Sequence, residues 1–464
     1  MTPGVGEPFP GVATAAGRPG ARPGPGLVEA VRAVAAGEVS SRELVRLALD
    51  RIAAASENAV VTVAAERALG EAARRDEDLM ADGPVGPLHG VPFTVKDAIA
   101  TAGIRSTAGA PELGTHVPAE EAPAVRLLRA AGAVLVGKTN CSPWSSDLET
   151  RNPVFGVTRN PWDPARTPGG SSGGSAAAIA TGLSAFDLGT DIGGSVRIPP
   201  AFCGVFGLKP TYGLVPAGGY LDTPAGAADP GPEMNVFGPI GHSAADLGVV
   251  LDVLAAPSGG DEAAWSVALP RARPDIPRGL RVAVLDEHPV TTTDPAVVAA
   301  VGRVTDRLAD AGAIVSRPAP PVPLDEIFAG FGTTLRAQTV LSHPDAAPLP
   351  VRDLVASQRE RARQRAAWAE WFTRVDVLLC PAVPTLAFPH DGRGRFRDRM
   401  IHCSDGVDRP GLVLTSWTGL ASSLYLPALV FPAEVHRGLP VGVQLVGPRF
   451  AEHTLVALAE VCTR

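Results

Sequence analysis

One lysine and two serines occupy positions that suit an acyl-transfer reaction. Lys96 ends the apolar segment VPFTVK, Ser171 and Ser172 lie between two pairs of glycines, and Ser195 follows two glycines. A serine hydroxyl becomes a good nucleophile only when a neighbouring base removes its proton. No local sequence marks a histidine as that base, but a lysine can serve if burial lowers its pKa from about 10.4. The residue types therefore indicate a serine nucleophile activated by a neutral lysine.

The glycines around these serines have a mechanical role. They let backbone N–H groups approach a reacting carbonyl, and they permit backbone conformations that other residues resist. The turn DIGGS (191–195) would direct N–H groups at a developing oxyanion, an arrangement typically worth orders of magnitude in rate. We expect Asp191 to support this turn by hydrogen bonding and not to act as a base.

Two widely used motifs match parts of the chain but fail in their context. GAVLVGKT (132–139) fits the phosphate-loop pattern, which needs a strand before the loop and a helix after it. Here the residues between the glycines are the strand itself, and Pro143 blocks a following helix. GGSSG (169–173) fits the nucleophile elbow of α/β-hydrolases, but the preceding NPWDPARTP holds three prolines where a strand is required. We reject both interpretations.

The composition of the chain limits the class of protein. Its 464 residues carry a net charge of −7, which argues against a nucleic-acid binder with a basic face. We find no apolar run long enough to span a membrane and no secretory signal. The five cysteines are scattered without a C-x-x-C pair, and no spacing suggests a zinc site. We therefore expect a cytoplasmic protein with free thiols, no metal, and no nucleic-acid or membrane partner.

Alternating helical and strand-like segments predict the elements that position the candidate residues. Residues 1–26 are rich in proline and glycine and predict a disordered tail. The remaining chain, 27–464, shows no clear internal boundary and is expected to form a single domain. The alternation indicates an α/β fold with a mainly parallel or mixed sheet. The predicted segments are a capped helix after Ser40, a helix over 64–81, a strand at 91–95, a helix over 121–131, a strand at 133–137, a small-residue helix after 174, a strand over 183–191, a β-α-β unit over 280–316, a long helix over 351–374, strands at 375–381 and 439–447, and a helix over 451–462.

The serine- and glycine-rich stretches resemble those of the amidase signature family of serine hydrolases. The resemblance covers most of the chain after about residue 27, and the spacing of 24 residues from Ser171 to Ser195 agrees with the family pattern. It implies the amidase signature fold, a central mixed β-sheet covered by helices on both faces. The matching segments are HGVPFTVKD (89–97), GKTN (137–140), RNPWDPARTPGGSSGGSAAA (159–178), GTDIGGSVRIPPAFCGVFGLKPTYG (189–213) and GLPVGVQLVGP (438–448).

The resemblance implies a Ser–cisSer–Lys triad. Ser195 is then the nucleophile, Ser171 follows a cis peptide bond from Gly170 and relays the proton, and Lys96 is the base and later the acid. Ser172 is the alternative relay, although the family motif gives that role to the first serine of the pair. Gly170, Ser172 and Asp191 are expected to support the site. The implied donors of the oxyanion hole are the backbone N–H groups of Ile192, Gly193, Gly194 and Ser195.

Four further features have less specific interpretations. We expect Arg197 to be structural and Cys203 to be a small core residue. Trp144 replaces the acidic residue that many relatives carry a few positions after GKTN; it either lines the substrate pocket or packs in the core. The loop HDGRGRFRDRM (390–400) either covers the pocket or is a solvated loop, and we favour the solvated loop.

The implied reaction is hydrolysis of the C–N bond of a small amide through an acyl-enzyme, without a cofactor or metal. Esters and carbamates follow the same geometry, which would make the protein a urethanase or an aryl acylamidase. The low charge near the motifs favours an apolar substrate, and we expect a monomer or homodimer. The alternative within the family is the amidase subunit of a tRNA-dependent glutamine amidotransferase, which releases ammonia for a partner subunit. Residues 221–243 look unlike that subunit.

Overall fold

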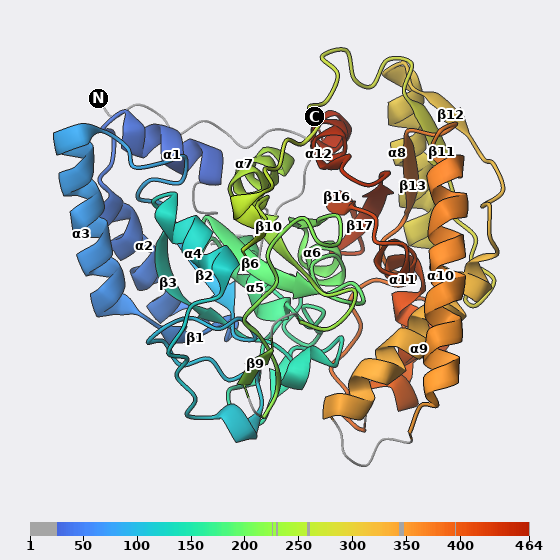
Figure 1. The fold of residues 1–464 in the computed structure, drawn as a ribbon, viewed down its shortest axis with the longest axis horizontal. Helices are drawn as coiled ribbons and strands as arrows, with labels where there is room; N and C mark the ends of the chain where they lie inside the picture. The colour runs from blue at the N-terminus through green and yellow to red at the C-terminus, as the bar shows by residue number, and fades with distance from the viewer. Residues whose placement is uncertain are drawn as a thin grey trace.

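A mixed sheet of eleven strands forms the centre of the molecule (Figure 1). The computed structural model describes residues 26–224, 226–228, 231–257, 260–342, 348–394 and 396–463. Parallel pairs lie toward both ends of the sheet, antiparallel pairs join them through the centre, and one edge strand is also antiparallel to its neighbour. In spatial order the strands are β1 (Val60–Val63), β3 (Val134–Thr139), β2 (Pro92–Lys96), β6 (Phe186–Asp191), β10 (Val236–Gly241), β7 (Phe206–Lys209), β16 (Ala428–His436), β17 (Leu439–Val446), β13 (Val377–Pro381), β11 (Arg281–Val284) and β12 (Ile314–Ser316).

Helices cover both faces of this sheet, as the family resemblance implied (Figure 1). One face packs against α1 (Leu27–Ala35), α4 (Pro123–Ala130), α7 (Ala244–Leu254), α8 (Pro295–Asp310) and α12 (Glu452–Thr463). The other face packs against α5 (Gly173–Ala180), α6 (Ile198–Cys203), α9 (Leu324–Ser342), α10 (Val351–Trp371) and α11 (Ser416–Ser423). The pair α2 (Ser41–Ala54) and α3 (Ala65–Asp82) packs beside β3.

Short elements outside the sheet complete the fold, and η3, β8, η5 and η6 supply residues to the cavity described below. Small ribbons are formed by β4 (Arg151–Asn152) with β5 (Gly156–Val157), β8 (Tyr220–Thr223) with β9 (Gly226–Ala228), and β14 (Met400–His402) with β15 (Asp408–Pro410). The 3₁₀ turns are η2 (Pro111–Leu113), η3 (Pro143–Ser145), η4 (Asp261–Ala263), η5 (Phe396–Asp398) and η6 (Gly411–Thr415).

The predicted elements are present with bounds that differ by a few residues. Helix α2 begins with a reciprocal capping box, in which the Ser40 N–H donates to Glu43 Oε2 at 2.8 Å and the Glu43 N–H donates to Ser40 Oγ. The segment VLVGKT is strand β3, so the rejection of a phosphate loop is confirmed. Lys138 is fully buried and donates to the hydroxyls of Thr101 and Ser106 at 2.6 and 2.9 Å.

Three central strands, β7, β10 and β16, were not predicted. Glycine or proline interrupts each of them, and both residues weaken a strand assignment made from sequence. Burial and close backbone packing override that weak propensity here. The predicted tail over 1–26 lies, except for Gly26, outside the described residues, and the single-domain organisation stays a prediction.

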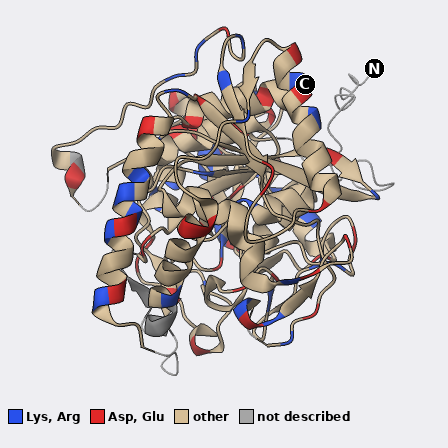
Figure 2. Cartoon of the chain, turned by 90° about the vertical axis from the view of Figure 1, so that its right-hand side faces the viewer, with Lys and Arg blue, Asp and Glu red and all other residues tan. Residues whose placement is uncertain are grey.

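Charged residues of both signs follow the outer helices, whereas few lie on the strands of the sheet (Figure 2). Among the described residues, no helix combines the length and the apolar character needed to cross a bilayer. The charged residues that are nevertheless fully buried include Lys96, Lys138, Asp191, Arg197 and Lys209. Because a buried charge is costly unless it is paired or neutralised, these residues indicate a candidate functional site at the centre of the sheet.

The close packing of β7 yields a test of the fold. A Cβ atom at Gly207 would lie 2.0 Å from the carbonyl oxygen of Val196. We expect Gly207→Ala to lower the free energy of unfolding by about 1–3 kcal/mol, measured by urea denaturation. In the control Gly302→Ala, within α8, the new Cβ meets nothing within 4 Å. The control should gain about 0.5–1 kcal/mol, and equal effects of the two changes would contradict the packing.

Candidate active site

Two neighbouring parallel strands bring Lys96 to the turn that carries Ser195. Strands β2 and β6 pair in parallel, with Val95 opposite Leu188, so their carboxyl ends lie at the same edge of the sheet. Lys96 is the last residue of β2, and β6 ends at Asp191, where the DIGGS turn begins. In α/β sheets the crevice outside the carboxyl ends of the strands is the usual place for a ligand.

The segment before α5 adds Ser171 to this edge. The peptide bond between Gly170 and Ser171 is cis, the arrangement that the family resemblance implies. The backbone N–H of Ser171 donates to Ser195 Oγ at 3.0 Å. A Cβ atom at Gly170 would lie 2.3 Å from the carbonyl oxygen of Asp147, so this position accommodates only glycine without movement of the neighbouring chain.

Lys96, Ser171 and Ser195 form a continuous hydrogen-bonded chain. Lys96 Nζ lies 2.6 Å from Ser171 Oγ, and Ser171 Oγ lies 2.9 Å from Ser195 Oγ. Lys96 and Ser171 are fully buried, and Ser195 is 9% exposed. A hydroxyl can both donate and accept, so a proton can move from Ser195 through Ser171 to a neutral lysine. The structure thus brings the three predicted residues together in the predicted order.

Burial decides the charge state of Lys96. It lowers the pKa of Lys96 to about 8, against the opposing charges of Asp191 and Asp187. The amine also donates to Thr190 Oγ1 at 2.7 Å. Sequence reasoning missed Thr190, although its place before Asp191 at the end of β6 makes it a neighbour of β2. A lysine that is neutral in part near physiological pH is able to act as a base.

Ser172 and Cys203 lie outside this chain of hydrogen bonds. Ser172 Oγ donates to the carbonyl of Thr190 at 3.3 Å, so the alternative relay residue does not connect Lys96 to Ser195. Cys203 is fully buried among apolar residues at the end of α6, and burial raises the pKa of its thiol. It is the small core residue that we expected.

A buried ion pair holds the DIGGS turn. Arg197 donates to both oxygens of Asp191 at 2.9 Å, and Asp191 in turn accepts the N–H groups of Gly194 at 2.8 Å and Val196 at 3.0 Å. Burial alone would raise the pKa of Asp191, but the charge and hydrogen bonds of Arg197 hold that pKa below its usual value. The structural roles expected for Asp191 and Arg197 agree with this geometry.

The same contacts exclude one of the expected donors of the oxyanion hole. The N–H of Gly194 is committed to Asp191 Oδ1, so it does not fit the role of an oxyanion donor. Within the described chain, the N–H groups of Ile192, Gly193 and Ser195 have no hydrogen-bond acceptor. Thr418 Oγ1 donates to the carbonyl of Gly193 at 2.7 Å and fixes the orientation of that peptide group.

The serines open into a cavity of about 820 Å³. Ser171, Thr190, Ile192, Gly193 and Ser195 form its catalytic end. Trp144 lines the cavity and also packs against the core, so both interpretations of this residue apply. The sequence did not single out the other walls. They come from η3, β8, α9, α10, η6 and the segments around residues 148 and 233, and include Pro143, Ser145, Leu148, Tyr220, Asp222, Glu233, Leu335, Gln338, Leu354, Gln358 and Leu412.

The prediction that residues 390–400 form a solvated loop is wrong. Gly394, Phe396 and Arg397 line the cavity, and Phe396 is buried. Arg399 donates to Asp147 Oδ1 at 2.7 Å and lies 3.0 Å from Glu149 Oε1. These ion pairs attach the loop to residues 147–149, which pack against Gly170. The many arginines of this loop suggested solvent exposure, but sequence alone does not reveal their partners.

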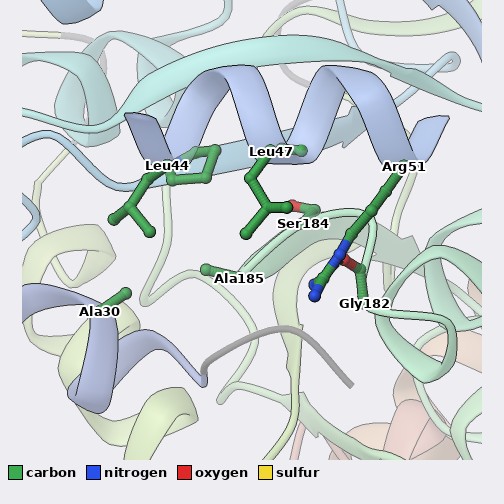
Figure 3. Close-up of a pocket in the computed structure, with 9 residues that line it drawn as sticks. Ala30, Leu44, Leu47, Arg51, Gly182, Ser184 and Ala185 are labelled. Atoms are coloured by element: carbon green, nitrogen blue, oxygen red, sulfur yellow. Dashed lines mark hydrogen bonds between the residues drawn. The ribbon is translucent and has the colours of Figure 1, made fainter. Parts of the chain in front are cut away.

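A second hollow lies between α2 and residues 182–185 (Figure 3). Its volume of about 20 Å³ is enough for roughly one water molecule. Arg51 lines this hollow and donates to the carbonyl of Gly182 at 3.1 Å, and no residue is shared with the cavity at Ser195. In the part of the chain that is described, no group of His, Cys, Asp and Glu side chains could hold a metal ion.

The comparisons with known proteins agree with the fold and the site geometry. The family model described as Amidase matches residues 43–342 and 335–456. A bacterial aryl acylamidase of the amidase signature family superposes with a TM-score of 0.82 at 25% identity, covering 94% of this chain and 95% of the other. The chain therefore belongs to the amidase signature family and is an enzyme that acts on amide C–N bonds.

Relatives with a curated name point to one branch of this family. The A subunit of the glutamyl-tRNA(Gln) amidotransferase from Roseiflexus sp. (strain RS-1) is 34% identical over an alignment of 485 positions, which covers 94% of this chain and 96% of the relative. The solved structure of the protein of the same name from Thermotoga maritima has a TM-score of 0.72 and 25% identity, with 91% of each chain covered.

The pKa of Lys96 yields a pH profile. Because burial lowers this pKa to about 8, the amine is neutral above that pH and protonated below it. We expect kcat/KM for a neutral amide to rise about tenfold per pH unit up to about 8 and then to level off. Thr190→Val removes one hydrogen bond to the ammonium form and should move the inflection to lower pH. A flat profile, or an inflection that Thr190→Val leaves in place, would exclude Lys96 as the base.

The buried ion pair yields a second test. Asp191→Asn leaves the Arg197 charge without its partner, and we expect a loss of about 3–5 kcal/mol in the free energy of unfolding. Because the turn loses its support, kcat should fall by about a hundredfold with little change in KM. The matched control is Asp163→Asn, which breaks the partly exposed pair with Arg166. The control should cost less than about 1 kcal/mol. An Asp191→Asn enzyme as stable and active as the control would contradict the assigned role.

Proposed function

We propose that this chain hydrolyses the C–N bond of a small amide through an acyl-enzyme on Ser195. The observation that carries the proposal is the buried chain from Lys96 through Ser171 to Ser195 at the end of a large cavity. No other cluster in the described part of the protein combines a hydroxyl nucleophile, a base of lowered pKa and free backbone donors in one cavity.

The reaction follows from the geometry. Neutral Lys96 accepts a proton from Ser171 while Ser171 accepts one from Ser195, and Ser195 Oγ attacks the amide carbonyl. The N–H groups of Ile192, Gly193 and Ser195 stabilise the negative charge on the carbonyl oxygen. The proton then returns through Ser171 to the leaving nitrogen, and the C–N bond breaks. Water attacks the ester of Ser195 by the same proton path, releases the acid and restores the free enzyme.

The curated relatives favour the amidotransferase reading over a urethanase or an aryl acylamidase. Their name and their nearly complete coverage of this chain support glutamine as a substrate, with ammonia passed to a partner subunit. Glutamine requires partners for its carboxylate and for its ammonium group. Arg397 and Asp222 both line the cavity and are candidates for these two roles.

The cavity itself favours a broader amidase. Its volume of about 820 Å³ lies in the upper part of the range that holds drug-sized ligands, which are much larger than one amino acid. The buried Arg361 beside it donates to Glu233 at 2.8 Å and to Thr334 at 3.0 Å, so its charge is already balanced within the protein. We therefore keep a small-molecule amidase as the proposed function, with ester or carbamate cleavage as side activities. The second candidate is the amidotransferase subunit. A cytoplasmic monomer or homodimer remains part of the first proposal.

A substrate panel tests the nucleophile and the substrate class together. The panel holds an anilide, a primary aliphatic amide, glutamine, a nitrophenyl ester and an aryl carbamate. We expect Ser195→Ala to lower hydrolysis of the preferred compound more than about a thousandfold. Ser172→Ala is the matched control and should remain active, because Ser172 is bonded to the carbonyl of Thr190.

The outcomes separate the candidates. Hydrolysis that persists in Ser195→Ala would exclude the proposed nucleophile. Cleavage of glutamine alone would favour the amidotransferase subunit, whereas a preference for the anilide or the aliphatic amide would favour the small-molecule amidase.

A further inference from the structure

We propose that Asp222 selects amide substrates that carry a positively charged amine, by binding the ammonium group at the wall of the cavity formed by β8. The proposal rests on the proposed function and narrows its substrate class. It assigns a specificity-determining role to a residue outside the serine–lysine chain.

The carboxylate of Asp222 borders the cavity, and one of its oxygens has no partner. Asp222 lies in β8 and lines the same cavity as Ser171 and Ser195. Its Oδ1 atom is buried and has no hydrogen-bond partner among the described residues. A buried polar atom without a partner is costly, and such atoms are rare in native proteins. Because both oxygens share the negative charge, a cation in the cavity beside Asp222 would lower that cost.

The other carboxylates of the cavity differ from Asp222 in this respect. Asp147 is paired with Arg399 at 2.7 Å, and Glu233 is paired with Arg361 at 2.8 Å. No ion pair within the described chain includes Asp222. A cation that enters the cavity can therefore pair with Asp222, whereas the charges of Asp147 and Glu233 are already balanced.

The surroundings of Asp222 also suit an ammonium group. Partial burial raises the pKa of Asp222, and a neighbouring cation would oppose that shift. The aromatic rings of Tyr220 and Trp144 line the same cavity, and β8 contacts the turn that holds Trp144. Aromatic faces attract cations, so ring and carboxylate act in the same direction.

Binding to an inactive enzyme tests the proposal without relying on turnover. The background is Ser195→Ala, and the probes are linear primary amides of increasing length that end in an ammonium, a methyl or a carboxylate group. Isothermal titration calorimetry gives the dissociation constants. We expect the best ammonium probe to bind about tenfold or more tightly than its methyl counterpart, and the carboxylate probe to bind most weakly.

Variants of Asp222 identify the residue responsible. Asp222→Asn in the Ser195→Ala background should reduce the ammonium preference to less than about twofold and leave binding of the methyl probe unchanged. Asp222→Glu keeps the charge and should retain part of the preference. The matched control is Asp275→Asn, which removes the same charge from an exposed side chain and should retain all of it. Because Asp222 Oδ1 makes no hydrogen bond, thermal melting of the Asn variant should match that of the background.

Two results would overturn the proposal. One is an ammonium preference that persists in Asp222→Asn, and the other is the absence of that preference in the Ser195→Ala background itself. The outcome for the proposed function is separate. Wild-type hydrolysis of these amides with a preference that Asp222→Asn does not alter would remove only the role of Asp222. An Asp222-dependent preference in binding without any hydrolysis by the wild type would remove only the proposed reaction.

Discussion

The ion pair between Asp191 and Arg197 is the constraint on which the rest of the site depends. Arg197 uses five hydrogen bonds to join the end of β6 to Thr418 and Ser422 of α11 and to Gln444 of β17. Asp191 holds the turn around Ser195, because it accepts hydrogen bonds from the N–H groups of Gly194 and Val196. Asp191 also acts on Lys96, because its charge opposes the lowering of the Lys96 pKa by burial. The same carboxylate therefore affects both the position of Ser195 and the protonation of Lys96.

The sequence predicted those parts of the molecule in which local chemistry and chain order agree. Lys96 at the end of an apolar strand, together with two serines in glycine-rich turns, indicated the hydrogen-bonded chain that the structure contains. The alternation of helices and strands indicated the mixed α/β sheet. Both inferences depend on short segments whose neighbours along the chain supply most of the needed information.

The remaining features depend on contacts between distant segments. Strands β7, β10 and β16 contain glycine or proline, and only their burial at the centre of the sheet stabilises them as strands. The position of the 390–400 loop depends on Arg399 meeting Asp147, a partner 252 residues away. Likewise, the loss of Gly194 as an oxyanion donor follows from a specific hydrogen bond to Asp191 and not from the turn sequence.

The attachment of the 390–400 loop has an evolutionary consequence. Its two ends are held near Glu149, which accepts the N–H of Gly392 at 3.2 Å and pairs with Arg399. The wall-forming positions Gly394, Phe396 and Arg397 lie between these anchors. Mutations at those positions can alter the shape of the cavity while the anchors keep the loop in place and the serines and Lys96 stay untouched. Over evolution, a few substitutions in this loop can thus change the substrate preference without producing an inactive intermediate.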